Sequence, residues 1–91
     1  MTHTIREKQK LINRVRRLRG QMESIERMLD EEKGCAEVMH VIAGVRGAIN
    51  GLMGEVIEDH IRMHLAAEGL TQQERDEGSA ELIDVIRAYV K

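Results

Sequence analysis

The chain has 91 residues, a formal net charge of −2 at pH 7, one cysteine, one tyrosine and no proline, tryptophan or phenylalanine. This length allows one domain at most, so we expect residues 1–91 to form a single all-α domain built from Leu, Ile, Val, Met and Ala. No apolar run could span a membrane or resembles a signal peptide, and a lone cysteine excludes an internal disulfide, so we expect a cytoplasmic protein.

The charge is distributed unevenly along the chain. Residues 1–20 carry seven basic side chains and one acidic one, a net charge of +6. The remaining residues carry seven basic and fifteen acidic side chains, a net charge of −8. A basic end on an acidic body predicts a polyanionic partner for that end.

A first helix is predicted from about Ile5, because Thr4 and Glu7 form a capping-box pattern just before it. Its apolar residues repeat in steps of four and three, which is a heptad seam. The seam consists of Leu11, Val15, Leu18, Met22, Ile25 and Leu29. The acidic residues 30–32 followed by Gly34 predict the end of this helix.

A second helix is predicted from about Cys35 to Ala67, ending before Gly69. Its seam consists of Val38, Ile42, Val45, Ile49, Leu52 and Val56. The short link between the two helices predicts an antiparallel hairpin.

A second capping-box pattern, at Thr71 and Glu74, predicts the start of a third helix. Gly78 is expected to be a weak point in it. The apolar face of this helix consists of Leu82, Ile83, Ile86 and Val90.

The lengths of the first two helices favour an oligomer. Each should be roughly 40–50 Å long, whereas a compact globule of this size has a radius of gyration of about 12 Å. A lone hairpin of that length has no closed core. Two hairpins that pack as a four-helix-bundle dimer would close it, and a homotetramer made of two such dimers is also expected.

Four glycines in the second helix, Gly44, Gly47, Gly51 and Gly54, lie on one helix face. Each should cost about 1 kcal/mol of helix stability relative to alanine, so a close helix approach is expected to offset the cost. The four are arranged symmetrically about position 49, and the same symmetry relates position 35 to position 63. An antiparallel pair of second helices explains both features. Alternatively, the small residues relieve crowding inside one hairpin.

A metal site is predicted from Cys35, His60 and His64. The two histidines lie one helical turn apart, and all three residue types bind soft or borderline metal ions. The 25 positions between Cys35 and His60 span roughly 37 Å of helix, so these residues meet only if Cys35 of one chain lies beside the histidines of another. Alternatively, Cys35 is a small apolar residue and the histidine spacing is accidental.

His3 and the N-terminal amine, which belongs to Thr2 if Met1 is removed, are expected to complete the ligand set. Six-coordinate Ni(II) or Co(II) would use these extra nitrogens, whereas four-coordinate Zn(II) would not need them. A single cysteine argues against Cu(I), which prefers more sulfur. The intervening Ile-Arg-Met sequence excludes the HExxH pattern of zinc proteases, and no nucleophile–base set is visible, so the chain is not expected to be an enzyme.

A basic stripe accompanies the first seam and predicts contact with duplex DNA phosphates. It consists of Arg6, Lys10, Arg14 and Arg17, widened by Arg16 and Arg19. The alternative is a solvated helix face. No aromatic residues are available for base stacking, so phosphate positioning is predicted and base readout is not.

Over essentially its whole length the chain resembles the CsoR/RcnR family of small helical bacterial repressors. The resemblance is carried by RVRRLRGQ at 14–21, Cys35, VRGAINGLMGEVIEDHIRMH at 45–64 and the terminal RAYVK. It implies a three-helix protomer, usually tetrameric, whose apo form binds an operator and is released by its effector. It also implies that Arg14 and Arg17 contact DNA, with Lys10 and Arg16 beside them. The roles of Arg46 and Asn50 stay open.

The start of the chain, MTHTIREKQKL, resembles the nickel/cobalt branch, which uses the terminal amine, a histidine matching His3, one cysteine and two histidines. The copper branch has a second cysteine where His64 stands, and the formaldehyde branch has a proline where Thr2 stands. We therefore expect a repressor that Ni(II) or Co(II) releases from genes for metal efflux. The alternatives are a formaldehyde-responsive repressor of the same family and a metal-binding helical bundle with no DNA role.

Overall fold

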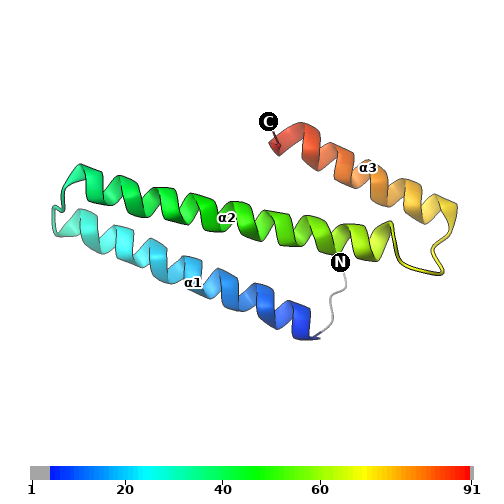
Figure 1. Cartoon of the computed structure of the whole chain (residues 1–91), viewed down its shortest axis with the longest axis horizontal. Coiled ribbons are helices and arrows are strands. Elements are labelled where there is room, and N and C mark those ends of the chain that lie inside the picture. Colours follow the sequence, from blue (N-terminus) through cyan, green and yellow to red (C-terminus); the bar gives the residue numbers. More distant parts are fainter. Residues whose placement is uncertain (1–4, 91) are drawn as a thin grey trace. The chain divides into compact units, whose positions relative to one another are not determined.

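Three helices make up the computed structural model, which describes residues 5–90 (Figure 1). They are α1 (Ile5–Asp30), α2 (Cys35–His64) and α3 (Gln72–Tyr89). No strand occurs in the described residues, and the predicted all-α class is confirmed. Within the same residues, no helix is both long enough and apolar enough to cross a membrane. The described chain divides into two compact units, 5–53 and 54–90, and α2 contributes to both.

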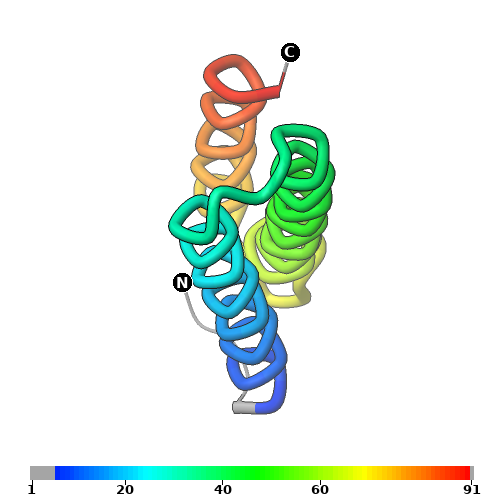
Figure 2. The backbone as a smooth tube through the Cα atoms, turned by 90° about the vertical axis from the view of Figure 1, so that its left-hand side faces the viewer, coloured from blue at the N-terminus to red at the C-terminus, as the bar shows by residue number. Residues whose placement is uncertain are grey.

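In the first unit, α1 and the first part of α2 lie side by side and run antiparallel, as the sequence predicts (Figures 1 and 2). The core of this hairpin consists of three buried side chains, Ile25, Val38 and Val45. Leu18, Met28 and Val41 pack around them. Because this core contains aliphatic side chains from both helices, it holds the hairpin together through burial of apolar surface.

Each predicted seam divides into a covered half and an uncovered half. Alternate seam residues of α2 differ sharply: Val38 and Val45 are 7% and 5% exposed, whereas Ile42 and Ile49 are 48% and 50% exposed. The seam of α1 divides in the same way, with Val15, Met22 and Leu29 exposed. One hairpin therefore covers only one side of each seam, because the two positions of a heptad point in different directions.

Helix α1 ends at Asp30, as predicted from the acidic residues 30–32 followed by Gly34, but Glu32 and not the glycine makes the turn. Glu32 adopts a left-handed conformation with φ of 56°. The N–H of Lys33 donates to the carbonyl of Met28 over 3.0 Å, and the N–H of Glu32 donates to that of Leu29 over 3.2 Å. This pair of bonds is a Schellman motif, which usually places glycine where Glu32 stands. Gly34 instead lies directly before α2, where its carbonyl accepts from the N–H of Val38.

Replacing Glu32 with glycine should stabilise the hairpin by about 0.5–1 kcal/mol, because a side chain in the left-handed region costs roughly 1–2 kcal/mol and glycine loses part of that gain to chain entropy. Urea unfolding would measure the change. Glu31→Gly is the matched control: its φ is not positive, so glycine there should lower stability. Equal effects of the two substitutions, or a loss of stability in Glu32→Gly, would contradict the strain at Glu32.

The second helix ends at His64, so the prediction that it reaches Ala67 is wrong. The carbonyl of Ile61 accepts from the N–H groups of both Leu65 and Ala66, over 3.0 and 2.8 Å. Sharing one carbonyl breaks the regular i→i−4 series, so the helix stops there.

The predicted start of α3 is confirmed by a complete capping box at Thr71 and Glu74. The backbone N–H of Thr71 donates to the carboxylate of Glu74, and the Thr71 hydroxyl accepts from the N–H of Glu74. The hydrogen bond with the Thr71 backbone is the main cause that lowers the pKa of the Glu74 carboxyl, and the hydrogen bond with the Thr71 side chain lowers it further. The other capping-box pattern includes Thr4, which lies outside the described residues.

Candidate functional site

Two histidines lie together near the end of α2, in the second unit. The ring centroids of His60 and His64 are 4.8 Å apart and the rings are tilted by 36°. Both residues are half-buried. One helical turn separates them, so both imidazoles can reach a single ion at ordinary metal–nitrogen distances of about 2.0–2.1 Å.

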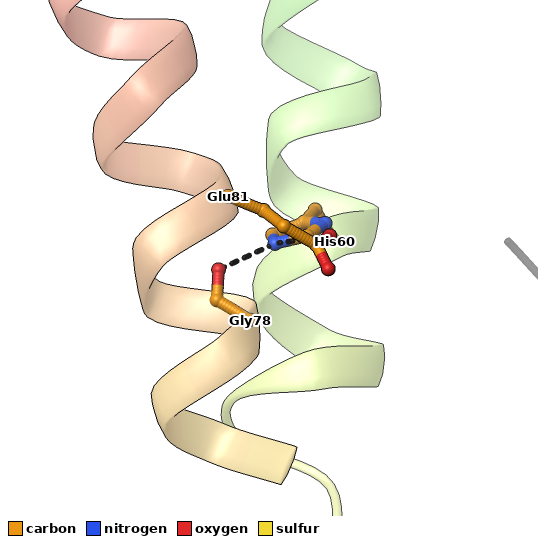
Figure 3. A network of polar contacts seen from close by, with 3 residues as sticks. All are labelled: His60, Gly78 and Glu81. Carbon is orange, nitrogen blue, oxygen red and sulfur yellow. Dashed lines mark hydrogen bonds and ion pairs between the residues drawn. The ribbon is translucent and has the colours of Figure 1, made fainter. Parts of the chain in front are cut away.

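The third helix contacts this histidine pair through Gly78 (Figure 3). The Nε2–H of His60 donates to the Gly78 carbonyl over 2.8 Å, and a carboxylate oxygen of Glu81 lies 4.0 Å from the same nitrogen. Among the residues of α3, all of which the structure describes, only Gly78 is buried. Gly78, which the sequence marks as a weak point of α3, is thus also a place where α3 packs closely against α2.

Sequence reasoning missed the contact of Gly78 and Glu81 with His60. The available signal was the glycine itself, since a helical glycine without a packing reason costs about 1 kcal/mol.

Cys35 occupies the first turn of α2, in the first unit, and its thiol is exposed. Thr2 and His3 lie outside the described residues. Within residues 5–90, no three His, Cys, Asp or Glu side chains come together in a way that could hold a metal ion. The described chain thus carries a thiol in one unit and a histidine pair in the other, and each is a candidate partial metal site.

The predicted DNA-contacting residues of α1 differ in exposure. Lys10, Arg16 and Arg17 are exposed, whereas Arg14 is half-buried. The Arg14 guanidinium packs against α2 at Gly51, which has no side chain. Its Nη2 is 3.0 Å from the point that a Cβ at Gly51 would occupy.

Arg14 and Arg17 also line a shallow pocket of about 160 Å³, together with Leu18, Gln21 and Ala48. Two arginines in its lining make this pocket suited to an anionic group such as a phosphate.

The other glycines of the stripe face open space. No described atom lies within 4 Å of a Cβ built at Gly44, Gly47 or Gly54. Relief of crowding within one hairpin therefore explains Gly51 but not these three. Arg46 and Asn50 are exposed on the same helix.

Comparison with known proteins gives consistent results. The model of a family described as metal-sensitive transcriptional repressors matches residues 7–88. The transcriptional repressor RcnR of Escherichia coli is 43% identical over 91 residues, and an uncharacterised protein in the bioA 5′ region of Serratia marcescens is 48% identical over 91 residues; each alignment covers 100% of both chains.

Among solved structures, the chain is similar to a glutamate-to-histidine variant of the formaldehyde-responsive regulator FrmR from Salmonella enterica serovar Typhimurium. The two share 40% sequence identity with a TM-score of 0.91, over 98% of this chain and 100% of that one.

Proposed function

This chain belongs to the family of metal-sensitive transcriptional repressors, whose members are not enzymes, and from that premise we propose that it represses genes for metal efflux until Ni(II) or Co(II) binds. In this proposal the apo protein holds operator DNA, and the metal-bound protein releases it. A repressor acts where the chromosome is, which places this one in the cytoplasm. The single observation that carries the proposal is the pair of partial sites on α2.

The proposed metal ligands are Cys35 from one protomer and His60 and His64 from its partner. His3 and the N-terminal amine, on Thr2 after removal of Met1, complete the set. This arrangement is supported by the exposed thiol at the start of α2 and the paired imidazoles near its end. A bound ion would act as a cross-link between protomers and would require deprotonated ligands, so mild acid should weaken it.

Assembly of two hairpins is supported by the uncovered half of each seam. Val15, Met22, Ile42 and Ile49 are each about half exposed, although they continue the same heptads as the core residues. Soluble monomers rarely leave long apolar stripes uncovered, so a second copy of the chain is the natural partner. We propose a dimer of this kind, and a tetramer built from two of them.

Gly47→Ala should weaken this assembly while stabilising the isolated helix. Alanine gains about 1 kcal/mol of helix propensity in a position with open space around it. In an assembly that brings two copies of α2 close together, the added methyl would separate them. Sedimentation equilibrium would measure the change, with Gly20→Ala as a control because it lies in α1, outside the stripe. Unchanged association of the Gly47 variant would argue against a glycine-mediated contact.

The nature of the donors supports nickel or cobalt. One thiolate with several nitrogens suits a borderline divalent ion, whereas Cu(I) prefers more sulfur. Zn(II) is expected to bind the thiolate and imidazoles without recruiting His3 and the terminal amine. Recruiting those N-terminal groups would displace α1, which carries the basic stripe formed by Lys10, Arg14, Arg16 and Arg17. A coupling of about 1–3 kcal/mol between the sites is typical and would lower operator affinity roughly 5- to 150-fold.

The experiment is a titration of operator binding, followed by fluorescence anisotropy, with Ni(II), Co(II), Zn(II) and Cu(I) in turn. Nickel or cobalt should release the DNA, and Cys35→Ala should abolish that release while leaving apo binding intact. If nickel still releases Cys35→Ala from the operator, the proposed metal mechanism is disproved. Failure of the wild-type protein to bind any duplex would favour a metal-binding bundle without a DNA role.

A second candidate, a formaldehyde-responsive repressor, is favoured by the similarity to FrmR, which is named for that response. An aldehyde would react with the Cys35 thiol and the terminal amine, without needing the imidazoles. Formaldehyde should then still release a His64→Ala variant from DNA, whereas a metal sensor would have lost its response to nickel. The same anisotropy assay therefore separates the two candidates.

A further inference from the structure

The hydrogen bond between His60 and Gly78 determines which ring nitrogen of His60 carries the proton. A backbone carbonyl can only accept, so the Nε2 that lies 2.8 Å from the Gly78 oxygen must be the donor. Glu81 lies near that same nitrogen at 4.0 Å. In the neutral ring the lone pair is consequently on Nδ1, which is the nitrogen left for a metal ion.

Close packing brings the Gly78 carbonyl to this place. A Cβ at Gly78 would stand 2.6 Å from the carbonyl oxygen of His64 and 2.9 Å from its Cβ. The nearest of these atoms is backbone, so it cannot move aside as the tip of a long side chain could. Any larger residue would therefore push α3 away from the end of α2, and the carbonyl would move with it.

We propose that Gly78 is a positioning residue for the metal site: its close approach holds His60 in the tautomer that presents Nδ1 to the cation. This inference rests on the proposed function, because it assumes that His60 is a ligand. A neighbour that fixes the tautomer and the ring orientation removes the need to select them when the metal binds. The hydrogen bond is also compatible with the bound state, since Nε2 stays a donor while Nδ1 coordinates.

The first test uses the metal-free protein. Long-range ¹H–¹⁵N NMR spectra of full-length wild-type protein, recorded with neutral imidazoles, should show His60 with its proton on Nε2. Gly78→Ala should give a mixture of the two tautomers. Ser79→Ala, next to Gly78 in α3, is the matched control and should leave the spectrum unchanged. A wild-type proton on Nδ1 would overturn the proposal.

The second test is the affinity for Ni(II), measured by competition with a chelator. Gly78→Ala should bind nickel roughly 10- to 100-fold more weakly, the usual effect of removing a group that orients a ligand. Wild-type affinity in a folded Gly78 variant would overturn the proposal.

A pair of substitutions at His60 keeps the test informative if the Gly78 variant does not fold. His60→Gln retains a side-chain N–H that can reach the Gly78 carbonyl, whereas His60→Ala removes it. Hydrogen exchange of α3 in the metal-free protein should stay close to wild type for glutamine and accelerate for alanine. Equal exchange in the two variants would show that the hydrogen bond to the Gly78 carbonyl does not form in solution and would overturn the proposal.

These results separate this inference from the proposed function. If the tautomer and exchange rates are as expected but nickel fails to release the protein from DNA, only the proposed function is disproved. If nickel releases the protein from DNA but His60 carries its proton on Nδ1, only the role of Gly78 is disproved.

Discussion

An equimolar mixture of Cys35→Ala and His64→Ala chains should form complete Ni(II) sites. Neither variant should form a complete site on its own. In an antiparallel dimer, each site combines the thiol of one chain with the imidazoles of the other. A mixed dimer therefore contains one site with every ligand and one site that lacks two. With random association half of the dimers are mixed, so about a quarter of the sites should be restored.

The measurement is the thiolate-to-nickel absorption band after the two variants are unfolded and refolded together. The matched control replaces the His64 variant with a double variant, Cys35→Ala and His64→Ala, which contributes no thiol and should restore nothing. Absence of the band in the first mixture, with mixed dimers verified by native mass spectrometry, would show that the ligands do not come from two chains.

Replacing Arg17 with alanine should weaken operator binding and also reduce its dependence on salt. If the wild-type protein neutralises six to ten phosphates, its affinity should fall roughly 10³–10⁵-fold between 50 and 200 mM salt. Each lost phosphate contact should lower the slope of log affinity against log salt concentration by about 0.9. Arg17 is preferred to Arg14 for this test, because Arg14 also packs across Gly51 and its loss would disturb the hairpin.

Lys33→Ala is the control for charge. Lys33 follows α1 outside the basic stripe, and its ammonium lies 3.9 Å from the Glu31 carboxylate. Its loss should leave the salt slope nearly unchanged. Equal slopes for wild type and the Arg17 variant, measured on the same duplex from 50 to 200 mM salt, would exclude Arg17 from the phosphate contacts.

The three helices follow from local signals in the sequence. Heptad spacing predicts α1 and the first part of α2, because an apolar residue at every third or fourth position needs a helix to bring the series onto one face. The capping box at Thr71 and Glu74 sets the start of α3, since both of its hydrogen bonds form within four residues. The metal-binding residue types were equally visible, as His60 and His64 lie one turn apart on any helix.

Other features depend on contacts that spacing does not encode. The predicted end of α1 is confirmed at Asp30, but the Schellman motif places Glu32 and not Gly34 in the left-handed conformation. The heptads of α1 and α2 do not reveal which half of each seam the hairpin covers, because that depends on how the two helices face each other. Ile42 and Val45 are alike as residue types, yet one is half exposed and the other buried.

The sequence by itself determined the helices, the basic end of the chain and the thiol and imidazoles suited to a metal ion, because each depends on residue type and on neighbours a few positions away. Only the tertiary structure decided that Gly78 meets His60, and with it which imidazole nitrogen is free. The two residues are 18 positions apart in different helices, and no periodicity along the chain specifies the direction in which a backbone carbonyl points.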